Sequence, residues 1–341
     1  MSALLTEKIG YIGYKEESLG FYPLEAKLTK RILLTGSDGQ LGSELLEVLQ
    51  YFGEVIPTVR GKEEQASFPS RKILDLGDKQ AIAELVKSVK PDLIVNPAAY
   101  TAVDRAEDAP DLAMKINGEA PAVLAEEGAK IGAELIHFST DYVYGDGFNE
   151  PILESATPNP LNVYGRTKLA GDDAVASMGS GLIVRTSWVY GMIGKNFVKT
   201  MLALAKDKTS LKVVDDQYGA PTYARNLAEV VGHLVFNYRG RFKELNQDKI
   251  RVIHATNQGG CTWYEFARNI FEFARSFGYK LKISELQPIS TINYSLPARR
   301  PSYSCLDNSL LAELCQVQLP DWKVGLEMFF RRVQAGLEIG H

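Results

Sequence analysis

The sequence has few cysteines, no excess of basic residues and no long apolar run, and each absence removes a class of protein. Its 341 residues include only three cysteines, Cys261, Cys305 and Cys315. An odd number without metal-ligand spacing argues against a disulfide framework, so we expect buried or free thiols. The formal charge is −4 and the pI is about 5.7, which leaves no basic footprint for nucleic acid. We therefore expect no nucleic-acid partner.

Membrane association is disfavoured on similar grounds. No apolar run approaches the roughly 20 residues that a membrane-spanning helix needs. Near the amino terminus, Glu7 and Lys8 stand where a secretory signal would require its apolar stretch. We expect a cytoplasmic location. The length predicts about two domains, and an apolar content of 45% is enough for a substantial core.

Strand and helix patterns alternate along the first 190 residues or so. Regular alternation of this kind predicts an α/β fold with a Rossmann-type, doubly wound parallel sheet. We expect strands at residues 32–34, 54–59, 72–76, 92–96, 133–138 and 182–186, and helices at 81–89 and 113–131.

The carboxyl-terminal third is organised differently. A strand pattern running into a turn covers residues 211–223, helical patterns cover 225–236 and 263–277, and the loops between them are polar and aromatic. We expect a smaller, mixed α/β carboxyl-terminal substrate lobe, with substrate bound between the lobes. The expected division is an amino-terminal extension (1–30), a Rossmann domain (31–190) with return segments from the later chain, and a mainly substrate-binding lobe (191–335).

The extension has no assigned role. It carries Tyr11, Tyr14, Phe21 and Tyr22 among charged residues, so it is too aromatic for an obvious disordered tail and too short for a domain. An arm that packs on the catalytic domain or on a second subunit and a frayed extension are equally compatible with this composition.

A glycine-rich loop follows the first expected strand. Residues 31–42 read RILLTGSDGQLG, and a helical pattern with leucines on one side comes next. Gly36 allows a tight turn, Gly39 lets backbone approach a pyrophosphate, and Gly42 lets helix pack closely on strand. The loop predicts a dinucleotide-binding site at a helix amino terminus.

The end of the second expected strand predicts which cofactor binds. An acidic residue there would bind the ribose hydroxyls of NAD, and none is present. Arg60 and Lys62 follow instead, and a guanidinium or ammonium suits a 2′-phosphate. NADPH is therefore the expected cofactor, with NADH still possible. The alternative is that both residues are ordinary solvated loop charges.

Two further loops fit the same cofactor. Asp75 ends the third expected strand, where it is placed to contact the adenine edge. The strand at 92–96 is followed by Pro97, Ala98, Ala99, Tyr100 and Thr101, whose first members are small enough for a cofactor to lie on the backbone.

Three residues form a candidate catalytic set. Tyr164 and Lys168 lie four positions apart, which places them on one face of a helix. A tyrosine can act as a general acid at neutral pH if a neighbouring cation stabilises its anion. Thr140 ends an apolar strand, where its hydroxyl can bond a substrate carbonyl oxygen. Such a pair also occurs by chance in many helices.

Longer motifs add a resemblance to a known family. They are STDYVYG at 139–145, NVYGRTK at 162–168, TSWVYG at 186–191, NFVKTM at 196–201, VVDDQYGAPT at 213–222 and PARRPSYSCLD at 297–307. Together they resemble the dTDP-4-dehydrorhamnose reductases, which are extended short-chain dehydrogenase/reductases, over about residues 31–330. The resemblance implies reduction of the C4 carbonyl of dTDP-4-dehydro-β-L-rhamnose by NADPH, the last step of dTDP-L-rhamnose synthesis.

The resemblance also implies roles for matching residues. Tyr164 matches the proton donor, Lys168 its activator and ribose ligand, and Thr140 the residue that orients the carbonyl. Further matches are Gly39, Gln40 and Leu41 at the pyrophosphate, Asp75 and Leu76 at the adenine, Ala99, Tyr100 and Thr101 beside the nicotinamide half, and Trp188 and Asp141 at the sugar. Arg299 and Arg300 are expected to contact substrate, or else to pair with surface carboxylates.

Other functions within and beyond the superfamily remain as alternatives. The related 4,6-dehydratases carry an acidic pair after the threonine, whereas here Asp141 is followed by Tyr142, which disfavours dehydration. Epimerases would hold NAD tightly. A regulatory subunit that resembles the β subunit of methionine adenosyltransferase is the alternative from another class, and a homodimer is a possible assembly. Some family members use magnesium at a subunit contact; Glu44 matches one ligand position, the other ligands find no match, and no metal is assigned.

Overall fold

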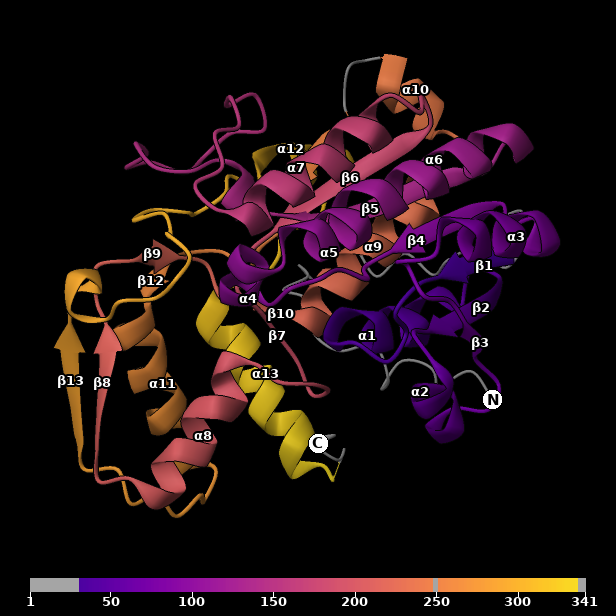
Figure 1. Ribbon diagram of the computed structural model, residues 1–341. Helices are drawn as coiled ribbons and strands as arrows, with labels where there is room; N and C mark the ends of the chain where they lie inside the picture. Colours follow the sequence, from indigo (N-terminus) through magenta and orange to yellow (C-terminus); the bar gives the residue numbers. More distant parts are fainter. Residues whose placement is uncertain (1–30, 248–250, 337–341) are drawn as a thin grey trace.

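A seven-stranded parallel sheet forms the centre of the protein in the computed structural model, which describes residues 31–247 and 251–336 (Figure 1). The order across the sheet is β11-β6-β5-β4-β1-β2-β3. These strands are β1 (Arg31–Leu34), β2 (Glu54–Val59), β3 (Lys72–Ile73), β4 (Leu93–Asn96), β5 (Glu134–Thr140), β6 (Gly181–Thr186) and β11 (Val252–His254). The chain proceeds outward from β1 in one direction and from β4 in the other, so the two strands flank a topological switch point. This confirms the Rossmann-type fold.

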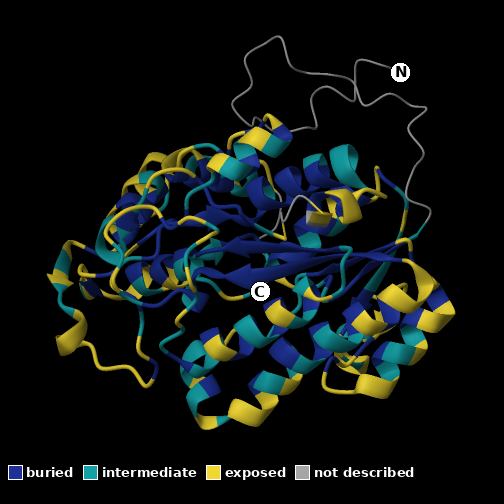
Figure 2. Cartoon of the chain, turned by 90° about the horizontal axis from the view of Figure 1, so that it is seen from above, coloured by how far each residue is buried: buried dark blue, intermediate teal, exposed yellow. Residues whose placement is uncertain are grey.

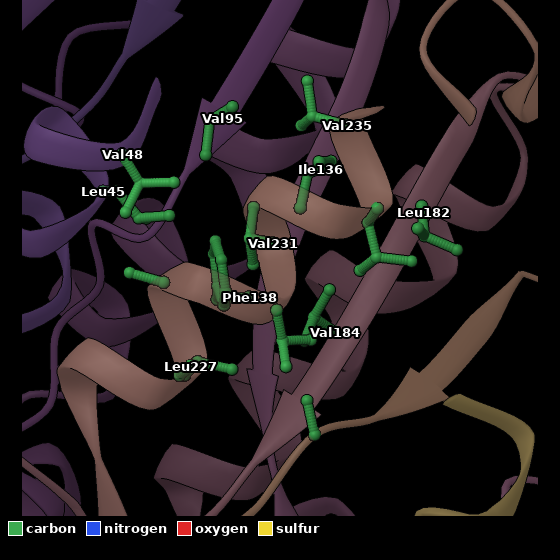
Figure 3. Packing of buried hydrophobic residues seen from close by; sticks show 14 of the residues in the cluster. Leu45, Val48, Val95, Ile136, Phe138, Leu182, Val184, Leu227, Val231 and Val235 are labelled. Carbon is green, nitrogen blue, oxygen red and sulfur yellow. The ribbon is translucent and has the colours of Figure 1, made fainter. Parts of the chain in front are cut away.

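Each central strand is apolar on both faces, as a sheet covered by helices on both sides requires. In β1, Ile32 and Leu34 pack on one face and Leu33 on the other. The first face is covered by α1 (Gln40–Leu49) and α9 (Ala224–Tyr238), whose Leu45, Val48, Leu227, Val231 and Val235 meet β4, β5 and β6 (Figure 3). The second is covered by α3 (Lys79–Val89), α6 (Ala120–Ile131) and α7 (Val163–Ala176). The strands are accordingly buried between helices with exposed outer faces (Figure 2).

Two expected elements differ from the structure. The helical segment expected at 113–131 is present, but a π-helical turn, η1 (Lys115–Glu119), interrupts it between α5 (Pro110–Met114) and α6. This turn directs the Asn117 side chain onto the backbone of Tyr100. The strand expected at 72–76 ends at Ile73, because Leu74 and Leu76 turn into the core beneath β1.

The smaller mixed lobe is confirmed as a separately packed group of elements (Figure 1). Its parallel pair β8 (Ser210–Val214) and β13 (Glu285–Ile289) packs with three helices, α8 (Phe197–Asp207), α11 (Trp263–Ser276) and α13 (Trp322–Gln334). Short pairs connect it to the sheet: β7 (Val189–Tyr190) with β10 (Thr222–Tyr223), and β9 (Tyr218–Gly219) with β12 (Cys261–Thr262). Aromatic residues dominate its core.

Later segments return to the large sheet. Besides α9 and β11, the helices α10 (Phe242–Gln247) and α12 (Ser309–Cys315) contribute to the core that α1 covers. The division into 31–190 and 191–335 stays a prediction, and residues 1–30 lie outside the described residues. The remaining short elements are α2 (Lys62–Ser67), α4 (Val103–Asp108), η2 (Asp141–Val143) and η3 (Thr291–Asn293).

Two expectations from composition can be compared with the structure. Cys261, Cys305 and Cys315 are buried free thiols, as expected. Within the described ranges, no helix combines the length and the apolar character needed to cross a membrane.

Candidate active site

The glycine loop between β1 and α1 has the geometry of a phosphate-binding loop. Gly36 adopts a φ of +53°, and a Cβ at Gly42 would lie 2.0 Å from the Gly36 carbonyl oxygen. The first turn of α1 therefore sits directly on the loop, and only glycine fits there. Gly39 precedes α1 without any side-chain cap, so the amides of the first turn are open to an anion. These residues fit a dinucleotide pyrophosphate.

The loops after β2 and β3 lie at the far end of this candidate cofactor site. Arg60 is exposed and its Nη2 pairs with Glu64 Oε1 at 2.7 Å. Asp75 is exposed and accepts a hydrogen bond from the Gly77 amide at 2.8 Å, whereas Leu76 is buried. Arg71, which the sequence interpretation missed, stacks its guanidinium 3.6 Å from the Phe68 ring centroid. Its Nη1 is buried with no hydrogen-bond partner within the described residues.

The loop after β4 is fixed by a residue of the π-helical turn. Asn117 accepts from the Tyr100 amide at 2.8 Å and donates to the Tyr100 carbonyl oxygen at 3.1 Å. It also donates to Thr167 Oγ1 on α7 at 3.2 Å. Asn117 thus ties the segment that contains Ala98, Ala99, Tyr100 and Thr101 to the helix of the candidate catalytic set. Sequence patterns could not reveal it, because a π-helical turn has no simple signature.

The structure brings Thr140, Tyr164 and Lys168 together. Asn162 caps α7 by accepting from the Gly165 amide at 2.8 Å. A Cβ at Gly165 would lie 2.4 Å from the Tyr142 carbonyl oxygen, so this helix packs directly against the turn that follows β5. The Tyr164 hydroxyl consequently lies near the Thr140 side chain, whose effect is to lower the pKa of the phenol. Lys168 is 1% exposed, and its Nζ donates to the Phe138 carbonyl oxygen at 2.6 Å.

Burial controls the charge of these groups. It raises the pKa of the Tyr164 hydroxyl above its usual value, and the nearby Thr140 side chain opposes this only in part. It lowers the pKa of Lys168 to about 8, against the attraction of the Asp172 carboxylate. At neutral pH the phenol is therefore protonated, as a proton donor must be, and Lys168 is mainly an ammonium.

Asp141 lies beside Thr140 and is 2% exposed. Its Oδ1 accepts from Thr140 Oγ1 at 2.9 Å, and its Oδ2 is buried without a hydrogen-bond partner in the described part of the chain. Desolvation raises the pKa of Asp141 to about 7, against the opposing effect of the Ser304 and Thr140 hydroxyls. A buried carboxyl with a free oxygen is suited to bind a sugar hydroxyl.

The two arginines of the PARRP segment diverge. Arg299 is exposed and its Nη2 pairs with Asp146 Oδ2 at 2.7 Å. Arg300 is largely buried and bonds Asp104 through Nη1 at 3.0 Å and Nη2 at 2.7 Å, and its charge acts against the raised pKa of the nearby Tyr142 hydroxyl. The Tyr142 ring lies edge-on to Tyr164, with centroids 5.8 Å apart. Arg300 therefore lies nearer the candidate catalytic set than Arg299, whose substrate contact stays a prediction.

Trp188 stands between the sheet and the small lobe. Its φ of +45° is unusual for a bulky residue and marks a constrained position. Its ring stacks on Trp263 with centroids 3.5 Å apart and planes at 9°. A Cβ at Gly219 would lie 2.5 Å from the same ring, so the indole is held from two sides. Sequence patterns did not identify Trp263, which is distant from Trp188 along the chain.

Glu44 does not fit a magnesium site. Both of its carboxylate oxygens accept from Arg332 Nη1, at 2.8 and 2.7 Å. Arg225 Nη1 lies 3.7 Å from Glu44 Oε2. Guanidinium groups thus occupy the positions that a cation would take. Within the described residues no group of three or more histidine, cysteine, aspartate or glutamate side chains could hold a metal ion.

Comparison with known proteins places the chain in a family. The model of the RmlD substrate binding domain matches residues 30–335. The chain is 39% identical over 304 residues to a dTDP-4-dehydrorhamnose reductase of Burkholderia thailandensis, covering 88% of this chain and 98% of the relative. It is 40% identical over 297 residues to the enzyme of that name from Escherichia coli strain K12, covering 87% and 95%.

Solved structures agree. A dTDP-4-dehydrorhamnose reductase from Clostridium acetobutylicum superimposes with a TM-score of 0.77 at 36% identity, covering 89% of this chain and 99% of that one. The reductase from Bacillus anthracis, solved in complex with NADP, gives 0.76 at 34% identity, covering 89% and 100%. The loops, the Thr140, Tyr164 and Lys168 set and these matches lead to one conclusion: this chain belongs to the dTDP-4-dehydrorhamnose reductase family.

Proposed function

We propose that this protein uses NADPH to reduce the C4 carbonyl of dTDP-4-dehydro-β-L-rhamnose, giving dTDP-β-L-rhamnose. The observation that carries the proposal is the approach of the Tyr164 hydroxyl to the Thr140 side chain at the carboxyl end of β5, with the buried Lys168 one turn further along α7. Membership of the reductase family supports the choice of substrate. A nucleotide sugar is then the small-molecule partner; a homodimer and a cytoplasmic location stay predictions.

Thr140, Tyr164 and Lys168 have different roles in this reduction. NADPH bound along the glycine loop supplies the hydride. Thr140 and Tyr164 hold the carbonyl oxygen of the sugar between their hydroxyls, which stabilises the charge that develops there. The Tyr164 hydroxyl proton passes to that oxygen, and the Lys168 ammonium stabilises the tyrosinate that remains.

Recognition falls to the surrounding groups. Asp141 accepts a sugar hydroxyl through its unpaired oxygen, and Trp188 offers an apolar face to the sugar. Tyr142 stands where a dehydratase of the superfamily carries a second acid, so elimination of water lacks a proton-transfer group. Reduction is the reaction that remains.

The cofactor proposal rests on the basic groups beyond the glycine loop. Arg60 and Arg71 supply positive charge near the adenosine end, and Arg71 has an unpaired, buried Nη1. A relative of 34% identity was solved with NADP. We propose NADPH as the preferred cofactor; a higher kcat/KM with NADH would contradict this.

One assay tests the proposed reaction. NADPH oxidation is followed by absorbance with dTDP-4-dehydro-β-L-rhamnose as substrate, beside dTDP-4-dehydro-6-deoxyglucose as a control. We expect turnover with the first and little with the second. No oxidation with either sugar, together with tight binding to a methionine adenosyltransferase, would instead establish the regulatory-subunit alternative.

A further inference from the structure

The Lys168 ammonium is held by β5 as well as by its own helix. It has three N–H donors. Nζ lies 2.6 Å from the Phe138 carbonyl oxygen and 3.1 Å from His137 Nε2. These two neighbours, adjacent in β5, take two of the three donors. One N–H is left, and Tyr164 lies one turn earlier on the same helix, so the two acceptors in β5 set the direction of the third N–H.

His137 is neutral in this environment. The residue is 0% exposed, and burial with the adjacent Lys168 charge lowers the pKa of its imidazole well below the usual value. A neutral imidazole has one donor and one acceptor nitrogen. Facing an ammonium, Nε2 has to be the acceptor, which leaves the proton on Nδ1.

The side chain of Asn96 contacts His137 and bears on which imidazole nitrogen carries the proton. Its Nδ2 lies 3.0 Å from His137 Nδ1, and its Oδ1 accepts from Thr35 Oγ1 at 2.6 Å. This amide orientation suits an Nε2–H tautomer facing a neutral lysine amine. A half-turn of the amide, which exchanges oxygen and nitrogen, suits the ammonium instead. The tautomer of His137 and the orientation of Asn96 are thus coupled to the charge of Lys168.

Other charges around the pair are fixed. Asp172, on α7, has its Oδ1 3.9 Å from His137 Nε2, while Arg185 of β6 holds its Oδ2 through Nε and Nη2, each at 3.0 Å. Tyr164 stands one turn before Lys168 on the same helix. From the η1 turn, the uncharged Asn117 donates a hydrogen bond to Thr167, next to Lys168 on α7. His137 is therefore the one neutral, reorientable acceptor that bonds Lys168 among these groups.

We propose that His137 is a positioning residue: its neutral imidazole accepts from the Lys168 ammonium, keeps that group charged and directs its remaining N–H toward Tyr164 and the cofactor ribose. This inference rests on the proposed function for its role in turnover. Its contact with the lysine can be tested without turnover.

Three variants separate this role from a structural one. His137→Phe removes the acceptor, and His137→Gln keeps a side-chain acceptor. His254→Phe is the matched control, since His254 is also 0% exposed but bonds Tyr144 and the Asp307 carbonyl oxygen. Thermal stability is measured for all three, because each removes buried hydrogen bonds.

The main readouts are the pH profiles of kcat and of the Kd for NADPH, the latter by cofactor fluorescence. The native protein should lose activity and cofactor affinity as pH rises through about 8, where Lys168 deprotonates. Loss of an acceptor destabilises the ammonium. His137→Phe should therefore move the alkaline decline of kcat and that of NADPH affinity to lower pH by about one unit. This corresponds to a roughly ten-fold change in the ratio of charged to neutral Lys168 at a given pH. His137→Gln should restore most of this shift, and His254→Phe should leave both declines in place. Unmoved declines in His137→Phe, or equal movement in His254→Phe, would overturn the proposal.

A measurement on the native protein covers the case in which His137→Phe fails to fold. The sequence has four histidines, so ¹⁵N-histidine labelling gives few imidazole signals. At pH 6 the His137 signal should report a protonated Nδ1 and an unprotonated Nε2; the opposite tautomer would contradict the inference. If NADPH binding shows the expected alkaline decline but the keto sugar is not reduced, the proposed function fails and the inference stands.

Discussion

The carboxyl edge of the large sheet is rich in buried polar groups, whereas the small lobe is packed with aromatic rings. At the edge, buried polar groups are joined by hydrogen bonds, as between Lys168 and His137, and by ion pairs, as between Asp172 and Arg185. In the lobe, rings pack on rings: Trp188 on Trp263, and Phe197 between Trp263 and Phe266. A polar network fixes directions and pKa values, whereas aromatic packing offers area and shape. We infer that the first region governs turnover and the second governs substrate affinity.

Tyr164→Phe should produce the largest effect. Loss of the general acid is expected to lower kcat about a thousand-fold. The Kd for NADPH should change less than about three-fold, because the ring and the helix remain. Steady-state kinetics and cofactor fluorescence measure the two quantities. Turnover close to the native value would show that another group donates the proton.

Lys168→Met should lower kcat about a hundred-fold at pH 7, since the tyrosinate loses its neighbouring cation. In the native protein kcat should decline above pH 8, because the amine becomes neutral there. The variant should lack that decline. A pH profile of each protein makes the comparison, and an unchanged alkaline limb in the variant would assign the limb to another group.

Gly219→Val tests the lobe side of the comparison. A Cβ at this position would lie 2.5 Å from the Trp188 ring, so the indole has to move. We expect the KM for the sugar nucleotide to rise about ten-fold with kcat nearly unchanged. Gly240→Val is the control for general destabilisation: its φ of +74° strains a valine, but no atom lies within 4 Å of the added Cβ and the Trp188 ring is not displaced. A fall in kcat alone would remove the distinction between the two regions.

Arg60→Ala and Arg71→Ala give a smaller effect at the cofactor. Preference for NADPH is measured as the kcat/KM for NADPH divided by the kcat/KM for NADH. Removing the guanidinium that bonds the 2′-phosphate should lower this ratio about ten-fold. We expect the larger change at Arg71, because Arg60 already pairs with Glu64. Equal ratios in both variants and the native protein would place the discrimination elsewhere.

Trp263→Leu is expected to have the smallest effect. It leaves Trp188 without its stacking partner, which should raise the substrate KM a few-fold and cost about 1 kcal/mol of stability beyond the lost area. Kinetics and thermal unfolding measure both. A large loss of kcat would contradict a role confined to shaping the lobe.

Much of the sheet and its loops could be predicted from local patterns. Apolar runs gave β1, β2, β4, β5 and β6, and the spacing of Gly36, Gly39 and Gly42 identified the turn into α1. Thr140, Tyr164 and Lys168 met as expected, because a strand end and a helix face are properties of short segments. Their roles in turnover stay predictions.

The rest depends on contacts between distant segments. Asn117 acts through a π-helical turn, and Trp263 is placed by the packing of α11 against β7 and α8. Which of Arg299 and Arg300 turns inward depends on the positions of Asp146 and Asp104, each more than 150 residues away. Such choices leave no periodic trace in a single sequence.

The edge strand β11 has a consequence for how the chain is made. It pairs with β6 but follows it by more than 60 residues, and most of the first part of the lobe lies between them. A ribosome therefore releases β6 long before its neighbour exists, and during that interval the strand presents unpaired backbone groups. Synthesis should be most prone to aggregation in this interval, and slowing translation just after β6 should reduce the yield of folded protein.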